Sequence, residues 1–306
     1  MSFTAKDVQL LRERTGVGMM DCKKALVEAD GDMDKAINIL REKGLAAAAK
    51  KSGRLAAEGM VYAYVDADRK VGSMVEVNSE TDFVAKNQEF QAFVKKVAQV
   101  VTEKNPSDLD ALLKAEFENG QTVMETLREK ILVVGENLSI RRFVRFEGEV
   151  VSYVHGEGRI GVLVRLEAAD GINPDVLNEC GKDIAMQIAA LNPLYLDKDS
   201  VPQGDIEKEK EILIAQIKND PKNANKPEQI IEKMVEGRLG KFYENNCLLN
   251  QAFVKDNGIT VGQYVAKMSE KAGGEIKVAE FVRFEKGEGL QKREDNFADE
   301  VASMIK

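Results

Sequence analysis

Residues 58 to 77 read Glu-Gly-Met-Val-Tyr-Ala-Tyr-Val-Asp-Ala-Asp-Arg-Lys-Val-Gly-Ser-Met-Val-Glu-Val, and residues 147 to 166 read Glu-Gly-Glu-Val-Val-Ser-Tyr-Val-His-Gly-Glu-Gly-Arg-Ile-Gly-Val-Leu-Val-Arg-Leu. The two stretches align without a gap, because one offset joins their first glycines, their shared tyrosines and their last glycines. Such self-similarity indicates an internal duplication. Each stretch has β-branched and aromatic residues on both sides of a polar turn, which predicts a β-hairpin at the start of each half.

The two copies diverge directly after the repeat. The first continues as Asn78-Ser79-Glu80-Thr81-Asp82-Phe83-Val84-Ala85-Lys86-Asn87, and the second as Glu167-Ala168-Ala169-Asp170-Gly171-Ile172-Asn173-Pro174. A segment that only the scaffold required would be present in both copies. The segment from 78 to 87 is therefore the first candidate for a function.

A helix and a closing strand are predicted after each hairpin. Apolar residues at helical spacing run from Phe90 to Val101 and from Ile184 to Ala189, and both patterns lead into Asn-Pro, where proline stops a helix. Phe-Val-Arg-Phe-Glu then occurs at 143–147 and again at 281–285, with strand-like alternation. We predict an α+β fold with a duplicated core of two antiparallel three-stranded sheets backed by helices.

The N-terminal 44 residues predict a unit of three helices. Thr4 and Asp7 form a capping-box pattern before the first helix. Asp32 can cap the third helix, which we expect Gly44 to close. The alanine-rich stretch from 45 to 57 predicts a helical or flexible linker to the core.

An insertion and a tail complete the predicted organisation. Two amphipathic stretches on either side of the Asn219 to Pro227 turn predict an antiparallel helical hairpin inserted in the second half. Asn296 can cap a C-terminal helix that must dock on the body or on a partner, since isolated short helices are marginal in water. The predicted division is an N-terminal helical domain and linker (1–55), the first half of the core (56–146), the second half (147–200 with 251–286), the inserted hairpin (201–250) and a C-terminal module (287–306).

Composition narrows the class of protein. A length of 306 residues is typical of about two domains. A hydrophobic content of 43% is enough for buried cores. The sequence shows no apolar stretch of membrane-spanning length and no signal-peptide core, so we expect a cytoplasmic protein that does not bind membranes. A net charge of −8 disfavours direct nucleic-acid binding. Cys22, Cys180 and Cys247 are odd in number and far apart, which predicts reduced thiols and no zinc site.

Two possible catalytic signals lie in the second repeat. Residues 156–161, Gly-Glu-Gly-Arg-Ile-Gly, match the dinucleotide fingerprint, but the repeat places them at a strand-to-strand turn, where no helix follows to face a phosphate. His155 is the only histidine and has no nucleophile pattern beside it. We expect His155 to be a contact residue at a hairpin tip and expect no cofactor or metal.

The segment Thr81-Asp82-Phe83-Val84 has two interpretations. In the first, Ser79 or Thr81 caps a helix and Phe83 and Val84 are buried under it. In the second, Phe83 is an exposed probe for a pocket in another protein and Asp82 disturbs a cation there. The presence of the segment in one copy only favours the second interpretation.

Four stretches together closely resemble the bacterial translation elongation factor Ts family: Arg12 to Leu26, Thr81 to Lys86, His155 to Val162 and Val235 to Arg238. The similarity extends over essentially the whole chain in the same order. It implies a guanine-nucleotide exchange factor for elongation factor Tu, which acts by protein binding and not as an enzyme.

The resemblance also implies roles for parts of the chain. The N-terminal unit, with Arg12, Met19 and Met20, would be similar to ubiquitin-associated domains and would dock on the partner's nucleotide-binding domain. The residue types alone do not decide whether Met19 and Met20 pack in the core of this unit or contact a partner. His155 would contact another domain of the partner, and the C-terminal helix would return to the nucleotide-binding domain.

For the segment from Thr81 to Val84, the resemblance implies insertion into that same domain. Phe83 would act as a wedge, and Asp82 would help to disturb the magnesium site, which weakens the hold on GDP. Two other classes remain open: a nucleotide-binding enzyme that uses the 156–161 turn, and a ubiquitin-associated-type scaffold that uses the N-terminal helices. The arm at 201–250 forms dimer contacts in some members of the family, so a homodimer is also an expectation.

Overall fold

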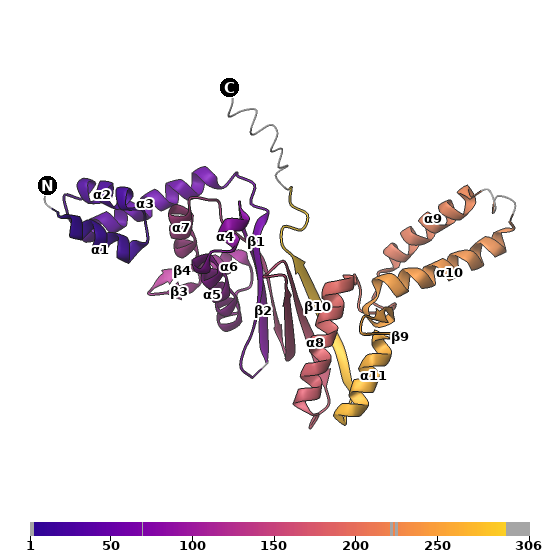
Figure 1. Cartoon of the computed structure of the whole chain (residues 1–306). Coiled ribbons are helices and arrows are strands. Elements are labelled where there is room, and N and C mark those ends of the chain that lie inside the picture. Colours follow the sequence, from indigo (N-terminus) through magenta and orange to yellow (C-terminus); the bar gives the residue numbers. More distant parts are fainter. Residues whose placement is uncertain (1–2, 69, 221–222, 224–225, 292–306) are drawn as a thin grey trace.

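The computed structural model describes residues 3–68, 70–220, 223 and 226–291 (Figure 1). Helices and antiparallel strands both contribute large parts of this region, so the fold is α+β, as predicted. In chain order the elements of the core and N-terminal unit are α1 Ala5–Thr15, α2 Met19–Glu28, α3 Met33–Lys51, β1 Glu58–Val65, β2 Val71–Ser79, α4 Asp82–Ala85, α5 Gln88–Lys104, α6 Leu109–Lys114, β3 Glu116–Glu118, β4 Gln121–Thr122, α7 Val123–Val134 and β5 Ser139–Glu147. The chain continues with β6 Glu149–His155, β7 Ile160–Ala168, α8 Pro174–Leu191, α9 Gln203–Asn219, α10 Glu228–Asn246, the 3-10 turn η1 Leu248–Asn250, β8 Ala252–Phe253, β9 Asp256–Thr260, α11 Val261–Ala272 and β10 Ile276–Glu285.

The three N-terminal helices form around a small apolar core. The capping box of Thr4 and Asp7 is present, and the Asp32 side chain accepts a hydrogen bond from Lys35 N at 3.0 Å, so both predicted helix starts are confirmed. Leu11 and Leu26 are among the residues buried between the helices. Side chains of α7 also pack against this core, so the unit does not rely on its own apolar residues alone.

The prediction that Gly44 ends the third helix was wrong. Helix α3 continues for about two more turns, to Lys51. A Cβ atom on Gly44 would lie 3.5 Å from the Arg128 carbonyl oxygen of α7 and 3.9 Å from Leu132 Cδ2. Gly44 therefore lies inside the helix, on the side that packs against α7, where a Cβ atom would make ordinary van der Waals contacts.

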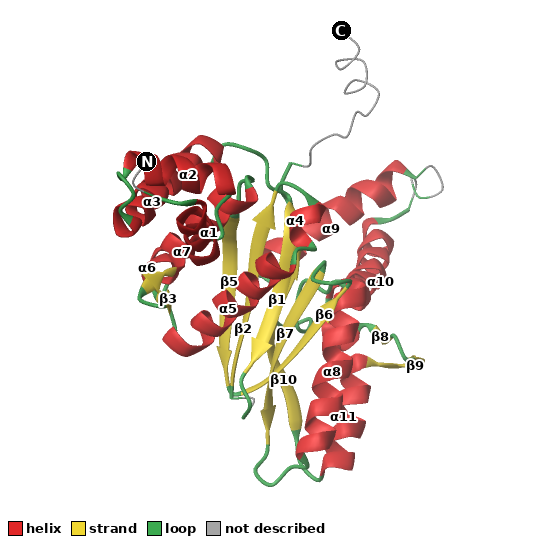
Figure 2. Ribbon diagram, turned by 60° about the vertical axis from the view of Figure 1, so that its left-hand side comes forward, coloured by secondary structure: helices red, strands yellow, loops and turns green. Residues whose placement is uncertain are grey.

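Two three-stranded antiparallel sheets form the centre of the molecule, in the orders β1-β2-β5 and β10-β7-β6 (Figure 2). The chain segment that forms each sheet contains a hairpin, a long helix, a two-stranded ribbon, a further helix and a closing strand, in the same order. Helices α5 and α8 end at Asn105 and Asn192, which adopt left-handed φ angles of 48° and 46° directly before proline. Both predicted helix ends are confirmed.

The sheets contact one another through a shared apolar layer that needs two glycines. A Cβ atom on Gly72 would lie 2.5 Å from Val150 Cγ1, and one on Gly161 would lie 2.4 Å from Val61 Cγ1. Gly72 and Gly161 occupy the same place in the two repeats, as do Val61 and Val150. The shared glycine of the repeat is therefore explained by the close approach of the two sheets.

The helical hairpin of α9 and α10 projects away from the sheets (Figure 1). Its apolar stripes face each other in a separate cluster whose buried members are Leu213, Ile217, Ile231, Val235 and Leu239. The predicted C-terminal helix lies outside the described residues. Over the part of the chain that the structure describes, no helix has the length and apolar character needed to cross a membrane.

Candidate functional site

The segment from Thr81 to Val84 directly follows the central strand of the first sheet. β2 ends at Ser79, and Thr81 is the N-cap of the short helix α4, with Val84 N donating to Thr81 Oγ1 at 3.4 Å. Ser79 does not cap the helix, since its hydroxyl donates to the Thr81 carbonyl oxygen at 2.9 Å. The capping part of the first interpretation is correct for Thr81.

Phe83 is 82% exposed, whereas Val84 is half-buried against the core of the first half. The prediction that Phe83 is accessible is confirmed, and the interpretation that buries it under the helix is wrong. Most exposed apolar side chains are unremarkable singly. Here the aromatic ring lies on a turn whose first residues are held by hydrogen bonds, so the backbone that carries it is ordered before any partner arrives.

Glu136, in the loop after α7, fixes that turn. Its carboxylate accepts hydrogen bonds from Thr81 Oγ1 at 2.7 Å, Thr81 N at 3.0 Å and Glu80 N at 3.1 Å. In return, Glu80 Oε1 accepts from Asn137 N at 2.6 Å. The loop before β5 and the segment after β2 are thus joined in both directions.

Sequence reasoning missed Glu136, although a signal existed. When the two halves are aligned on Phe143 and Phe281 of their closing strands, Gly274 occupies the position that corresponds to Glu136. The acid that holds the one-copy segment is therefore itself present in one copy only. A residue-by-residue comparison of the halves would have linked them.

Asp82 is exposed and forms an ion pair with Lys86 one turn later, with Lys86 Nζ 2.6 Å from Asp82 Oδ2. The hydrogen bond from Lys86 holds the pKa of Asp82 below its usual value, and the same contact raises the pKa of Lys86. Glu157 and Glu58 add to the raised pKa of Lys86, which indicates that other acids lie near this turn. Asp82 is consequently a carboxylate at neutral pH.

The second hairpin brings His155 to the same end of the core. His155 ends β6, and its Nδ1 lies 3.0 Å from the Tyr153 hydroxyl. The turn beyond it docks on the first sheet, since Val61 N donates to the Gly158 carbonyl oxygen at 2.8 Å. β7 begins at Ile160, so a strand and not a helix follows Gly156 and Gly158. The prediction that residues 156–161 lie at a strand-to-strand turn is confirmed.

The N-terminal candidates lie on a separate surface. Arg12 is exposed on α1, and Met19 and Met20 at the start of α2 are 42% and 62% exposed. Core packing is therefore not the role of either methionine. In Figure 1, α2 and α4 lie apart, with α3 and α7 between them. The structure does not bring these residues into contact with Phe83.

Groups suited to covalent or metal chemistry are few. Within the described ranges, no three His, Cys, Asp or Glu side chains gather as metal ligands would. Cys22, Cys180 and Cys247 are buried and free, as predicted. Burial raises the pKa of Cys180 to about 12 and that of Cys247 to about 11, so neither thiol is a ready nucleophile at neutral pH. The surface is suited to contact with another molecule.

The exposed aromatic side chain and the anchored turn beneath it suit a protein that acts by contact with another protein. The comparisons with known proteins agree. Residues 80–288 match the family described as Elongation factor TS. The chain is 51% identical over 306 residues to Elongation factor Ts of Clostridium botulinum (strain Eklund 17B / Type B), with 99% of each chain covered.

Further relatives give the same result. The chain is 53% identical to Elongation factor Ts of Clostridium perfringens (strain SM101 / Type A), again with 99% of each chain covered, and 49% identical to that of Clostridium acetobutylicum, with 99% of this chain and 98% of the relative covered. The chain therefore belongs to the elongation factor Ts family. It is a translation elongation factor that acts by protein binding and is not a catalytic enzyme.

Proposed function

We propose that the chain is a guanine-nucleotide exchange factor that binds elongation factor Tu and promotes the release of GDP. The observation that carries the proposal is the 82% exposure of Phe83 on a turn held by Glu136. Because the backbone of the turn is already held, insertion of Phe83 into a pocket need not order the turn, and the conformational cost of binding is limited to the rotamer freedom of the side chain. Family membership supplies the partner, and the exposed Phe83 supplies the contact.

Asp82 is the second part of the proposed mechanism. Its lowered pKa keeps it charged, so next to a magnesium site it would compete with the ligands of the metal. Loss of the metal removes the positive charge that holds the diphosphate. Lys86, which pairs with Asp82 in the free protein, would have to release it on binding.

Energetics require further contacts. Weakening nucleotide about 10⁴-fold needs roughly 5.5 kcal/mol of differential binding. Burying one phenylalanine supplies only about 1.5 to 3 kcal/mol. The exposed Arg12, Met19 and Met20 of a ubiquitin-associated-like N-terminal unit, together with His155, are the residues that we propose supply additional binding.

The exchange must run in both directions. A factor that weakens the binding of nucleotide is itself bound less tightly when nucleotide is present, because coupling between two ligands is reciprocal. GTP would therefore displace the factor after GDP has left. No cofactor takes part in this cycle.

Four finer points belong to the same proposal. The equal order of elements in the two halves supports an origin by duplication. The division into 1–55, 56–146, 147–200 with 251–286, 201–250 and 287–306 follows that order. The separate apolar cluster of the arm supports a role in contacts such as a homodimer. A role in translation supports a cytoplasmic location.

The test is the release of labelled GDP from elongation factor Tu with and without the chain. We expect faster release with the chain present, and tight binding to the nucleotide-free partner. An unchanged rate at saturating concentration would overturn the proposal. Binding of free nucleotide by the chain alone would instead favour the nucleotide-enzyme class, which the strand after the 156–161 turn disfavours.

A further inference from the structure

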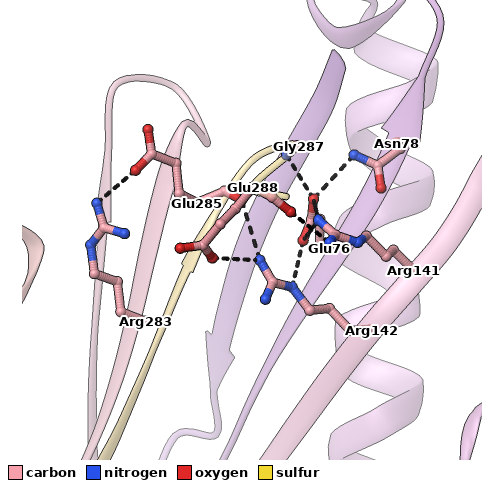
Figure 3. Close-up of polar contacts among 8 residues, drawn as sticks. All are labelled: Glu76, Asn78, Arg141, Arg142, Arg283, Glu285, Gly287 and Glu288. Atoms are coloured by element: carbon pink, nitrogen blue, oxygen red, sulfur yellow. Dashed lines mark hydrogen bonds and ion pairs between the residues drawn. The ribbon is translucent and has the colours of Figure 1, made fainter. Parts of the chain in front are cut away.

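Glu76 is a buried acid in the middle of the first sheet. Its side chain is 0% exposed, and four groups donate to its carboxylate. Arg142 Nε lies at 2.6 Å, Gly287 N at 2.8 Å, and Arg141 Nη1 and Asn78 Nδ2 each at 3.1 Å (Figure 3). Burial would raise the pKa of Glu76, but the hydrogen bonds from Gly287, Asn78 and Arg142 outweigh it and hold the pKa below its usual value.

The donors join two distant parts of the chain. Arg141 and Arg142 belong to β5 of the first sheet, whereas Gly287 follows β10, the closing strand of the second. Arg141 Nη2 donates to the Glu288 carbonyl oxygen at 2.6 Å, and Arg142 Nη2 lies 3.2 Å from Glu288 Oε2 (Figure 3). Gly287 and Glu288 are thus fixed to the first sheet.

Glu76 is also close in sequence to the exposed segment. Asn78, two residues later on β2, donates both to Glu76 Oε1 and to the Glu58 carbonyl oxygen, each at 3.1 Å. Thr81 follows three residues after Asn78. Lys286 forms an ion pair with Glu58 and also contributes to the lowered pKa of Asp82. One buried carboxylate therefore links the end of β2 to the chain at 286–288.

The sheet itself does not need a buried acid here. In the second half, Arg165 takes the place of Glu76 and Glu280 takes the place of Arg142, so the same register position carries an ion pair of reversed sign. Arg165 Nε lies 2.5 Å from Glu280 Oε1, with side chains that are 27% and 47% exposed. A buried carboxylate needs strong compensation for its desolvation. The partly exposed pair of reversed sign in the other half shows that the sheet can form without such a carboxylate. The burial of Glu76 goes with its hydrogen bond from Gly287 N.

We propose that Glu76 is a positioning residue that ties residues 286–288 to the Thr81–Val84 segment, so that the chain directly after β10 and the Phe83 turn are held as one unit. The consequence for exchange rests on the function proposed above. The mechanical link itself does not, because it is present in the free protein.

The link is tested first without a partner, by hydrogen–deuterium exchange of Glu76→Gln. The amide side chain offers one acceptor in place of two and turns an N–H group toward a guanidinium. We expect backbone amides of 79–84 and of 287–290 to exchange faster together, by about tenfold, as for a lost hydrogen bond to a charged group. The matched control is Glu280→Gln, which breaks the equivalent pair in the second half and should change neither segment. A response of only one segment to Glu76→Gln would overturn the proposal.

The effect on exchange is tested with the same pair of variants and with the unaltered chain. We expect Glu76→Gln to raise the concentration needed for half-maximal GDP release by about tenfold, because a surface that is not pre-organised binds more weakly. The maximal rate should change less. If the unaltered chain accelerates release but Glu76→Gln and Glu280→Gln behave alike, the inference fails while the proposed function stands. If the unaltered chain is inactive, the proposed function fails and the hydrogen-exchange result still decides the link.

Two further variants separate positioning from folding. The double change Glu76→Arg with Arg142→Glu copies the pair of the second half. It should restore the free energy of unfolding but not the concentration needed for half-maximal GDP release, because Gly287 N and Arg141 then lack their acceptor. A return of this concentration to the value of the unaltered chain would show that only the cross-strand pair matters. Arg141→Met removes the hydrogen bonds from Arg141 to Glu76 and to the Glu288 carbonyl oxygen, and leaves Glu76 paired with Arg142. Should Glu76→Gln not fold, this variant is expected to loosen 287–290 and 79–84 together, and unchanged exchange in both segments would overturn the proposal.

Discussion

Glu136 receives both the backbone N–H and the hydroxyl of Thr81, at 3.0 Å and 2.7 Å, so a loop 55 residues further along the chain sets the start of the Phe83 turn. The turn itself is short, since α4 is a helix of four residues. A single turn of helix is not stable in isolation. Its shape therefore depends on contacts that come from other elements.

Removal of Glu136 should loosen this turn. Glu136→Ala leaves three part-buried donors without their acceptor, at a cost of about 1 to 3 kcal/mol in the free energy of unfolding. GDP release from elongation factor Tu should also become slower. Chemical denaturation and the release assay measure the two effects. Glu118→Ala, which breaks only the exposed ion pair with Lys96, is the control and should alter neither.

Phe83→Ala should separate function from stability. Because Phe83 is 82% exposed, its truncation should leave the free energy of unfolding nearly unchanged, yet GDP release should slow markedly. Phe90→Ala is the matched contrast, since Phe90 is 2% exposed and its truncation should cost about 3 to 5 kcal/mol. If Phe83→Ala is unfolded under conditions where the unaltered chain is folded, Phe83 has a packing role.

Asp82→Asn should slow release in a magnesium-dependent way. A neutral amide competes poorly for the metal, so the defect should grow as magnesium is raised, and Phe83→Ala should also be worsened by high magnesium. The pKa of Asp82 is lowered, so the carboxylate stays charged and the defect should be constant between about pH 6 and 8. Release rates over a magnesium series at each pH provide the measurement. A defect that is independent of magnesium would point to a contact role only.

The three thiols should resist modification in the folded protein. Burial raises the pKa of Cys22, that of Cys180 to about 12 and that of Cys247 to about 11, so each thiol stays protonated near neutral pH, and the reactive thiolate is rare. A colorimetric thiol reagent should react with all three only after denaturant is added. Rapid reaction of one thiol in native buffer would show that its surroundings open locally.

Deletion of the arm should leave the core folded. Replacement of 205–245 by a short Gly/Ser bridge removes an apolar cluster that is separate from those of the two sheets. Circular dichroism and a cooperative melting transition should report an intact remainder. A shift in oligomeric state measured by light scattering would assign the arm to self-association. Loss of the melting transition would contradict its independence.

Much of the architecture could be predicted from local pattern. The repeat, the Asn-Pro helix ends and the closing strands led to two similar halves, because hairpins and amphipathic helices leave clear periodic signals. The short ribbons β3-β4 and β8-β9 and the helices after them were not foreseen. Strands of two to five residues carry too few alternations to be recognised.

The end of α3 shows why local rules fail at packed surfaces. Glycine is a frequent helix terminator, but α3 runs past Gly44 to Lys51 and packs against α7 at this position. At Gly72 and Gly161 the neighbours come much closer, because a Cβ atom on either would clash with a valine of the other sheet. In all three places the neighbour that decides the role of glycine is distant in sequence.

The sequence by itself determined the order of the elements, the reduced cysteines, the absence of Thr81–Val84 from the second copy and the resemblance to the elongation factor Ts family. These properties depend on residue type and spacing within short windows. Only the tertiary structure decided that Phe83 points outward, that Glu136 holds its turn and that Glu76 is buried beneath residues 287–288. Those outcomes depend on side chains that meet from separate strands and loops, and a one-dimensional pattern does not specify which of them will meet.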